Sequence, residues 1–458
     1  MRLALAFLLS CAASSAVLPA QEAPPLAAVQ REDVIVTATR APEPAENVPA
    51  SVAVVPAADL AAQASPALDV ALRQVPGFTL FRRTDSRYAN PTAQGVSLRG
   101  VGASGASRAL VVDDGIPIND AFGGWVYWAQ VPREEIERVE ILRGGGADLY
   151  GGPALAGVVR LFRRSATEPM IDAEASGGSE GTAEGSLFAV LASPQWSMSG
   201  GVDGYRTNGF VAVRSSERGP VDVAVRSRHA SGDVTAEYRP SEGARIFGRA
   251  SEYQESRGNG TPSQVNDTRL RSLSAGADIG AGPGWATAHV FRSLETYHQT
   301  FSSIAADRSS ETLSRAQTVP SSSWRANAQW RAPLGRSELV AGVEWRAVEG
   351  ASAEDVFAGP VAFSESRGRQ EGYGIFAADL LPLGPVTVQA VARLDGWRNF
   401  DAEKVSRPRD GQAETRTGLP SRRETAVSPR LGAIWRISEP ASVFVSRRRH
   451  TVDTRREL

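Results

Sequence analysis

The chain has 458 residues, and its 50 basic residues nearly balance its 51 acidic residues. This near-neutral charge gives no electrostatic argument for binding to nucleic acid. The length exceeds that of one ordinary domain, so it predicts two domains.

The first twenty residues have the pattern of a secretory signal peptide. A basic residue is followed by an apolar core at residues 3–9 and by small residues at Ala16 and Ala20, and we expect cleavage after Ala20. Cys11, the single cysteine, lies in this segment, so we expect neither a disulfide nor a thiolate metal site in the mature chain. A lipoprotein signal ending at this cysteine is the weaker alternative.

The remainder of the chain lacks a run of about 18 apolar residues, which excludes a membrane-spanning helix. An exported chain without such a helix is a periplasmic protein, a secreted protein or an outer-membrane β-barrel. The pattern of its β-strands distinguishes these classes, because barrels cross the membrane with short alternating strands.

A β-branched segment, residues 31–40, follows a leader of residues 21–30 that is rich in Ala and Pro and lacks periodicity. A short extended strand with free backbone groups can add itself to the sheet edge of a partner protein. It can equally pair with a strand of its own chain. The residues alone leave both alternatives open.

Residues 46–165 predict a small α+β domain. A strand is expected at residues 51–55, a helix at residues 56–63, and a second helix that begins at Ser65 and ends before Gly77. The apolar positions of this second helix have helical spacing and are expected to face a core. They are Leu68, Ala71 and Leu72.

Glycine-rich turns separate three apolar runs in the second half of this domain. The runs predict strands at residues 109–113, 139–143 and 157–162. Residues 132–137 have the pattern of a helix N-terminus. The glycine cluster at residues 144–146 completes no phosphate-binding motif, so we expect it to form a tight turn.

From about residue 166 the pattern changes to alternating segments of roughly ten residues that are separated by Gly, Pro, Ser and Asp turns. The clearest segment is residues 386–395, and the same alternation occurs in residues 339–346 and 431–437. In the clearest segment, period 2 separates an apolar face of Val386, Val388, Ala390, Ala392 and Leu394 from a polar face of Thr387, Gln389, Arg393 and Asp395.

A sheet with one apolar and one charged face is either a soluble sandwich or a membrane barrel with a polar lumen. The strand length and the tryptophans near expected strand ends favour the barrel. These tryptophans are Trp285, Trp324, Trp330 and Trp397. We expect about fourteen strands at roughly ten residues each.

The sequence offers no pattern for catalysis, and we expect no cofactor. The four histidines are scattered, and His289 and His298 would lie on opposite faces of one strand, which argues against a metal site. No carboxylate pair has the arrangement of a general acid and base. We therefore predict a protein that is not an enzyme.

Several ordered motifs in residues 94–164 resemble the plug domain of TonB-dependent outer-membrane receptors. They are the Arg-Gly steps at Arg99 and Arg143, the Asp-Asp-Gly turn at residues 113–115, and the runs at residues 136–144 and 149–151. The resemblance extends in weaker form from Glu32 to the end of the chain. It implies a mainly β fold, in which an N-terminal α+β plug domain precedes an antiparallel β-barrel in outer-membrane lipid.

The resemblance also implies a division of the chain. We expect a signal peptide (1–20), a periplasmic leader (21–45), a plug domain (46–165), a partial barrel (166–446) and an atypical tail (447–458). Plugged transporters have about 22 strands, so about fourteen would make an incomplete barrel. Because the alternation stops after Ser446, we expect a truncated receptor whose last residues are read out of frame.

Three sets of site residues follow from the resemblance. The TonB box, which recruits the energy-transducing protein TonB with its inner-membrane complex, corresponds to Glu32, Asp33, Val34, Ile35, Val36, Thr37 and Ala38. Arg99 and Arg143 correspond to plug arginines that pair with barrel glutamates, although Gly145 and Arg160 depart from the usual pattern nearby. Possible ligand contacts are Arg83, Tyr88, Phe122, Trp125, Tyr127 and Trp128, of which the last four could equally pack within the plug.

The expected function is energy-coupled import of a scarce small ligand, such as a siderophore, a vitamin or an oligosaccharide, across the outer membrane. The alternatives are a fragment of such a receptor that transports nothing, and an exported β-sandwich that binds a ligand. A receptor that also transduces signals needs an additional periplasmic domain ahead of the box, and residues 21–31 leave no room for it.

Overall fold

The computed structural model of the protein describes residues 35–36, 40, 42–44, 47–63, 65, 67–82, 84–101, 105–164, 166–438 and 441–448. Most of the predicted TonB box at residues 32–38, the predicted ligand contact Arg83 and residues 449–458 of the predicted atypical tail lie outside these ranges. The described elements belong to one compact unit that begins at Ile35.

A five-stranded sheet with the order β3-β8-β9-β6-β7 is the centre of the plug, which we define as residues 47–164. Strands β6 and β9 are parallel, and the other neighbours are antiparallel. The elements of the plug are β3 (Ser51–Pro56), α1 (Ala57–Ala61), α2 (Leu68–Leu72), β4 (Phe78–Leu80), β5 (Val96–Leu98), β6 (Ala109–Asp113), β7 (Ile116–Pro117), β8 (Ile136–Arg143), α3 (Ala147–Tyr150) and β9 (Gly157–Arg163). The predicted α+β plug is therefore present.

The core of the plug forms where α1 and α2 cover this sheet. The predicted apolar face of α2 is buried there, and Trp128 joins it with 2 % of its surface exposed. Residues 132–137 differ from the expected helix: a short 3₁₀ turn spans Arg133–Glu135, and β8 begins at Ile136. Pairing of Ile136 with Arg163 in β9 outweighs the local helical preference.

The glycine cluster forms a packed turn, as expected. Gly144 has a φ of +96°, which favours glycine, and a side chain at Gly146 would come within 2.9 Å of Val158 Cγ2. The helix that follows, α3, has only 4 residues.

Asp69 in α2 is a carboxyl group buried inside the plug. It accepts hydrogen bonds from the backbone nitrogen of Ser86 (3.1 Å) and from the Ser86 hydroxyl (2.5 Å). Burial, together with the Asp85 carboxylate, raises the pKa of Asp69 to about 6. Because the folded pKa lies above the unfolded value, Asp69 stabilises the fold at low pH, and this contribution is lost as the pH rises through about 6.

The substitution Asp69→Asn removes this titration and is expected to stabilise the plug only at high pH. We expect a gain of about 2 kcal/mol in the free energy of unfolding at pH 8 and little change at pH 4. Urea unfolding of the detergent-solubilised protein at both pH values measures the gain. The control is Asp59→Asn in α1, an exposed position, and an equal gain at both pH values for Asp69→Asn would contradict the assignment.

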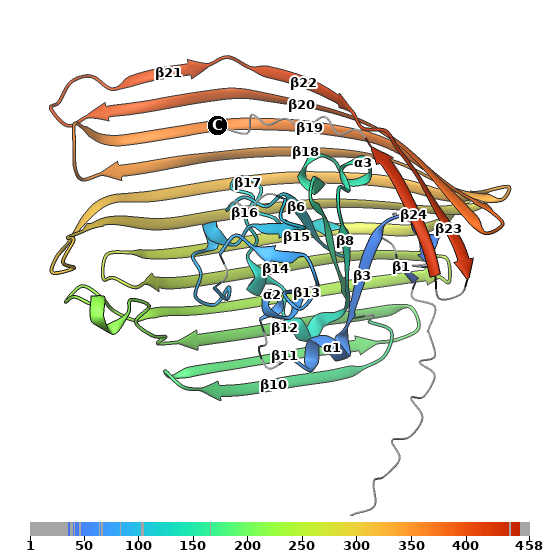
Figure 1. The fold of residues 1–458 in the computed structure, drawn as a ribbon, viewed down its shortest axis with the longest axis horizontal. Coiled ribbons are helices and arrows are strands. Elements are labelled where there is room, and N and C mark those ends of the chain that lie inside the picture. The colour runs from blue at the N-terminus through green and yellow to red at the C-terminus, as the bar shows by residue number, and fades with distance from the viewer. Residues whose placement is uncertain are drawn as a thin grey trace, which may run out of the picture. The chain divides into compact units, whose positions relative to one another are not determined.

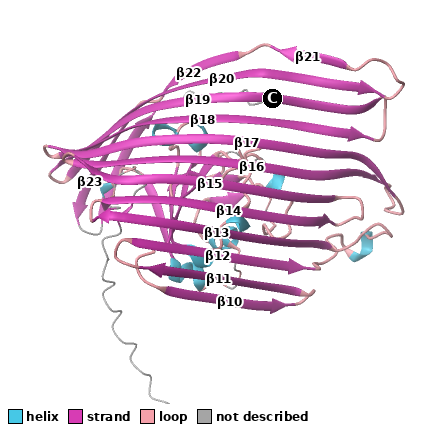
Figure 2. Cartoon of the chain, turned by 180° about the vertical axis from the view of Figure 1, so that it is seen from behind, coloured by secondary structure: helices cyan, strands magenta, loops and turns pink. Residues whose placement is uncertain are grey.

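A 15-stranded antiparallel sheet follows the plug. Its strands are β10 (Met170–Gly178), β11 (Thr182–Ala192), β12 (Trp196–Thr207), β13 (Val225–Ser241), β14 (Ala244–Asn259), β15 (Val265–Ala281), β16 (Gly284–Ile304), β17 (Glu311–Leu334), β18 (Ser337–Val356), β19 (Val361–Leu383), β20 (Val386–Pro408), β21 (Thr415–Leu419), β22 (Arg422–Val427), β23 (Arg430–Ser438) and β24 (Ala441–Arg448). Figures 1 and 2 show that, from β10 to β20, each strand lies beside its neighbours in the sequence.

The 15 strands of this sheet agree with the expectation of about fourteen, although they occupy fewer positions. Strands β21, β22 and β23 pair with successive parts of β20 and share one position, which leaves 13 positions along the path from β10 to β24. Among the described residues β10 and β24 do not pair with each other, so the sheet is not closed. A single sheet of this kind also excludes the β-sandwich alternative.

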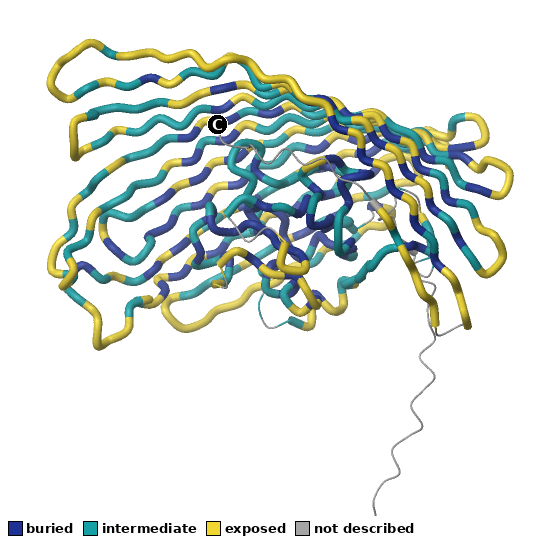
Figure 3. The backbone as a smooth tube through the Cα atoms, turned by 45° about the horizontal axis from the view of Figure 1, so that its top comes forward, coloured by how far each residue is buried: buried dark blue, intermediate teal, exposed yellow. Residues whose placement is uncertain are grey.

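The sheet has an inner face, which contacts the plug, and an outer face, as the alternation predicted. Thr387, Gln389 and Arg393 on the inner face are 8 %, 2 % and 4 % exposed, whereas Leu394 on the outer face is 41 % exposed. Figure 3 shows buried positions alternating with exposed ones along these strands. Trp285, Trp324 and Trp330 are exposed, but Trp397 lines a cavity on the inner face.

Candidate functional site at the interface of plug and sheet

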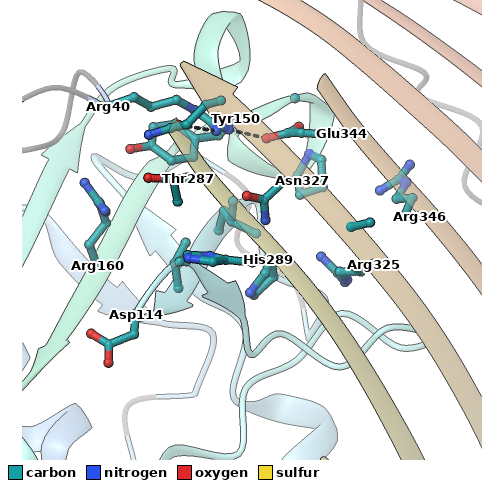
Figure 4. Close-up of a pocket in the computed structure, with 18 of the residues that line it drawn as sticks. Arg40, Asp114, Tyr150, Arg160, Thr287, His289, Arg325, Asn327, Glu344 and Arg346 are labelled. Atoms are coloured by element: carbon teal, nitrogen blue, oxygen red, sulfur yellow. Dashed lines mark hydrogen bonds and ion pairs between the residues drawn. The ribbon is translucent and has the colours of Figure 1, made fainter. Parts of the chain in front are cut away.

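Arg40, which follows the predicted TonB box, is anchored to the inner face of the sheet. Its guanidinium lies 4.4 Å from the ring centroid of Tyr150 in α3 and 4.3 Å from that of Phe376 in β19, and it pairs with Glu344 in β18 (Figure 4). Its side chain is only 10 % exposed. Arg40 therefore joins the start of the described chain to both the plug and the sheet.

A second arginine, Arg393 in β20, reinforces the same contact. It donates hydrogen bonds to the carbonyl oxygen of Leu149 (3.0 Å) in α3 and to Glu344 (2.7 Å), the carboxylate that Arg40 also uses. The Arg393 guanidinium fills the space beside Gly374, where a Cβ atom would lie 2.1 Å from its Nη2. A Cβ atom at this position of β19 would require the Arg393 guanidinium to shift from its bonds to α3 and Glu344.

We expect the substitution Arg40→Gln to release the segment that contains strand β1 (Ile35–Val36) from its attachment at Glu344, Tyr150 and Phe376. Loss of the charge-assisted bond to Glu344 and of two cation–π contacts removes about 2–3 kcal/mol of local stabilisation. A nitroxide label at residue 36 is expected to change from a slow to a fast spectrum in the variant. The matched control is Arg436→Gln, which removes the bond to Asn47 elsewhere on the plug, and equal mobility in both variants would contradict the role of Arg40.

A buried ion cluster joins the plug to strands β13 and β14. Arg163 in β9 bonds to Asp113 (2.8 Å), to Asp233 in β13 (2.8 Å) and to Glu135. From the other side, Arg249 in β14 bonds to Asp113 (3.1 Å) and to Asp114 (2.8 Å). The Asp-Asp-Gly turn noted in the sequence thus lies between an arginine of the plug and an arginine of the sheet.

The carboxylates of this cluster outnumber its two arginines. The pKa of one carboxyl group, Asp113, is lowered, and the pKa of another, Glu135, is raised. Burial raises the pKa of Asp113, but Arg163 and Arg249 outweigh it, so the value lies below the usual range. Burial raises the pKa of Glu135 to about 9 despite Arg163, because Asp233 and Asp113 add to its cost of ionisation. Glu135 therefore carries a proton at neutral pH, although it bonds to Arg163.

An ion pair and a hydrogen bond join the plug to further strands. Arg430 in β23 bonds to Asp148 (3.3 Å), and these side chains are 1 % and 0 % exposed. Tyr127 donates its hydroxyl to Glu295 in β16 (2.5 Å). Together with the Arg163 cluster, these contacts hold the plug to β13, β14, β16 and β23.

The two arginines that the sequence suggested lie elsewhere. The backbone nitrogen of Arg99 donates a hydrogen bond to the carbonyl oxygen of Gly77 (2.7 Å). The guanidinium of Arg143 donates a hydrogen bond to the carbonyl oxygen of Pro76 (3.1 Å). Neither guanidinium forms an ion pair with a carboxylate within the described ranges. Their pairing with barrel glutamates stays a prediction, and the contacts to the sheet that are present use other arginines.

The aromatic residues considered as ligand contacts divide into packed and partly exposed groups. Tyr127 and Trp128 are each 2 % exposed, so packing occupies their surfaces, and the packing alternative accounts for them. The ring of Trp125 lies 5.7 Å from that of Tyr297 in β16, and the ring of Phe122 fills the space beside Gly350 in β18. Tyr88 contacts Phe210 in the loop after β12.

Strand β1 contains the only residues of the predicted TonB box that the structure describes. It pairs with β2 (Glu43–Pro44) in an antiparallel arrangement, as the internal-pairing alternative supposed. A two-residue strand offers few backbone bonds, so this pairing does not prevent exchange for the edge of a partner sheet.

Sequence reasoning missed the residues that make most of the contacts to the sheet, namely Arg40, Asp148, Arg163, Arg249, Arg393 and Arg430. For Arg393 the sequence did contain a signal, because period 2 assigned it to the polar face of its strand. Polar groups on a buried inner face need hydrogen-bond partners, so a contact with the plug could have been predicted. Among the described residues, no group of three or more His, Cys, Asp or Glu side chains is arranged to hold a metal ion. None of the described helices is both long and apolar enough to cross a bilayer.

Two family models match the chain. The model of the TonB-dependent receptor plug domain matches residues 44–158, and that of the TonB-dependent receptor-like β-barrel matches residues 200–447, which is more than half of the chain. The chain belongs to the TonB-dependent receptor family. The mainly β fold with a plug and an incomplete barrel sheet, predicted from the sequence, is confirmed.

Among curated relatives, the vitamin B12 transporter BtuB of Photobacterium profundum is 31 % identical over 166 residues, 36 % of this chain and 26 % of the relative. The iron-regulated outer membrane virulence protein of Vibrio cholerae is 31 % identical over 144 residues, 29 % of this chain and 20 % of the relative. These alignments cover about a quarter or less of the relatives' length.

Solved structures share the fold at low identity. The ferric-catecholate import receptor Fiu of E. coli has a TM-score of 0.68 and 15 % identity, with 90 % of this chain and 71 % of Fiu covered. The ferripyoverdine receptor of Pseudomonas aeruginosa has a TM-score of 0.71 and 15 % identity, with 90 % of this chain and 58 % of that receptor covered.

Proposed function

We propose that the chain is the plug and a large part of the barrel of a receptor that imports a small, scarce ligand across the outer membrane, with energy supplied through TonB. The observation that carries this proposal is the position of Arg40. It lies directly after the expected TonB box, and it contacts α3 of the plug and strands β18 and β19 of the sheet. Tension on the box would therefore act first on the contact that holds α3 to the sheet.

The connections between strands support an orientation in the membrane. Turns of two or three residues occur at one end of the sheet, as between β13 and β14, and longer connections such as residues 208–224 occur at the other. Barrels of this type have short periplasmic turns and long extracellular loops. Tyr88, which contacts the loop after β12, is then on the extracellular side with the proposed ligand site.

The ligand class is proposed from the relatives and from the partly exposed aromatic residues. A vitamin, a ferric siderophore or an oligosaccharide fits a site that includes Tyr88, Phe122 and Trp125, because their rings can stack on a ligand. Arg83 belongs to the same proposed set. The family is one of receptors and transporters, and no catalytic role is proposed for any of these residues.

The proposal is tested by locating the protein and measuring uptake. Expressed with its leader in a Gram-negative host that lacks its own receptors, the chain is expected in the outer-membrane fraction. Uptake of labelled cobalamin, ferric siderophores and oligosaccharides is then compared in cells with and without TonB. Recovery in the soluble periplasm contradicts the membrane assignment, and uptake that is independent of TonB contradicts the coupling.

A further inference from the structure

A cavity of about 710 Å³ lies between the plug and the inner face of the sheet. Strands β13 to β20 form one side of it, and β6, β9 and α3 of the plug form the other. Cavities of a few hundred to a thousand Å³ are typical of sites for small ligands. Arg239 and Arg245 place it near the short turn between β13 and β14, at the end of the sheet opposite to the long loops.

The lining of this cavity has an excess of positive charge. It contains twelve arginines and no lysine, against seven carboxylates. Three carboxylates outside the lining, Asp113, Asp172 and Glu338, also pair with lining arginines, so the arginines still outnumber the carboxylates by a smaller margin. The carboxylates are shared: Glu237 bonds to both Arg239 and Arg245, and Glu344 bonds to both Arg40 and Arg393. Protonation of Glu135 increases the excess. A concave surface of one charge sign between low-dielectric walls concentrates ions of the opposite sign.

The donors are arranged on two sides of the same space. Figure 4 shows Arg160 of the plug on one side, Arg325 in β17 and Arg346 in β18 on the other, and His289 in β16 between them. Both ring nitrogens of His289 are buried and hydrogen-bond to no described residue. Thr287 and Asn327 add neutral groups that can donate hydrogen bonds.

We propose that this cavity is a binding site for a small anion that carries two or more carboxylate or phosphate groups. Planar guanidinium groups bind both kinds of oxyanion through paired hydrogen bonds, which lysine cannot reproduce. Several arginines around one cavity favour a ligand with more than one anionic group. The site is separate from the aromatic residues proposed for ligand capture, and its binding does not depend on the proposed import.

The experiment is calorimetric titration of the detergent-purified chain with citrate, pyrophosphate and the neutral polyol sorbitol. We expect at least one of the two anions to bind with a dissociation constant below 1 mM at low salt, and sorbitol not to bind. Affinity is expected to fall as NaCl is raised, because salt screens the attraction between the anion and the arginines. The preferred anion distinguishes a carboxylate ligand from a phosphate ligand.

Variants connect the binding to the cavity. Arg325→Gln combined with Arg346→Gln is expected to weaken anion binding at least tenfold. The matched control is Arg315→Gln, which lies in the same strand as Arg325 but outside the cavity and is expected to change affinity less than twofold. If the double variant fails to fold, as judged by its circular dichroism, Arg108→Gln replaces it, because no described carboxylate contacts the Arg108 guanidinium, and a threefold loss is expected.

Three results would overturn the proposal. They are the absence of binding by both anions, equal binding of sorbitol, and an equal loss of affinity in the control variant Arg315→Gln. Because the assay uses no transport, a failed uptake experiment would leave this result unaffected, and a failed titration would leave the proposed import untouched.

Discussion

Replacement of Arg163 by glutamine is expected to lower the free energy of unfolding of the plug by about 3–5 kcal/mol at pH 7. The guanidinium bonds to Asp113, Glu135 and Asp233, and its loss leaves the buried Asp233 without this counter-charge and Asp113 with Arg249 alone. Urea unfolding of the solubilised protein measures the effect.

The same variant is expected to show a pH dependence with a defined sign. In the native protein the pKa of Asp113 is lowered, so its contribution to stability is present above the unfolded pKa of about 3.9 and is lost as the pH falls through the folded value. The defect of Arg163→Gln is therefore largest at neutral pH and shrinks below about pH 4.

Arg164→Gln is the matched control for this prediction. Arg164 is the next residue, and its ion pair with Asp172 is partly exposed, so its loss is expected to cost less than about 1 kcal/mol. Adding Asp113→Asn to Arg163→Gln is expected to restore part of the stability. Equal effects of the two arginine substitutions would show that the buried cluster does not hold the plug.

The second large effect is expected for Trp128→Ala. Trp128 is 2 % exposed and its ring meets that of Phe78 in a T-shaped contact at 6.0 Å. Removal of a fully buried aromatic side chain from a packed core costs about 3–5 kcal/mol. We expect this loss in urea unfolding, with about half of it recovered by Trp128→Phe.

This prediction separates packing from ligand binding. Trp125→Ala is the comparison, because Trp125 is only partly buried and contacts Tyr297 across the interface. We expect it to cost less stability than Trp128→Ala and to have the larger effect on ligand affinity. A variant Trp128→Ala that unfolds like the native protein but binds ligand poorly would reverse the assignment.

The sequence predicted the faces of the strands well because alternation is a local property. Period 2 alone assigned Thr387, Gln389 and Arg393 to one face, and all three are buried against the plug side. The apolar positions of α2 were predicted for the same kind of reason. The polar inner face and the apolar outer face together indicated a barrel.

The pairing of arginines with carboxylates could not be predicted. Arg163 and Asp233 are 70 residues apart, and Arg430 and Asp148 are 282 residues apart. No local pattern specifies which of many arginines meets which carboxylate, because that depends on how the plug is oriented against the sheet. The resemblance implied a role for Arg99 and Arg143, whereas the arginines that join plug and sheet, such as Arg163, Arg249 and Arg393, lie outside the recognised motifs.

Disulfide trapping between residue 36 and the periplasmic domain of TonB tests the central claim most directly. The chain has a single native cysteine, Cys11, in the predicted signal peptide, so Val36→Cys supplies a unique thiol for cysteines placed along the edge strand of TonB. We predict a cross-link in intact cells that increases when Arg40→Gln is added. A chain that resides in the outer membrane and forms no cross-link, with or without Arg40→Gln, would contradict the account.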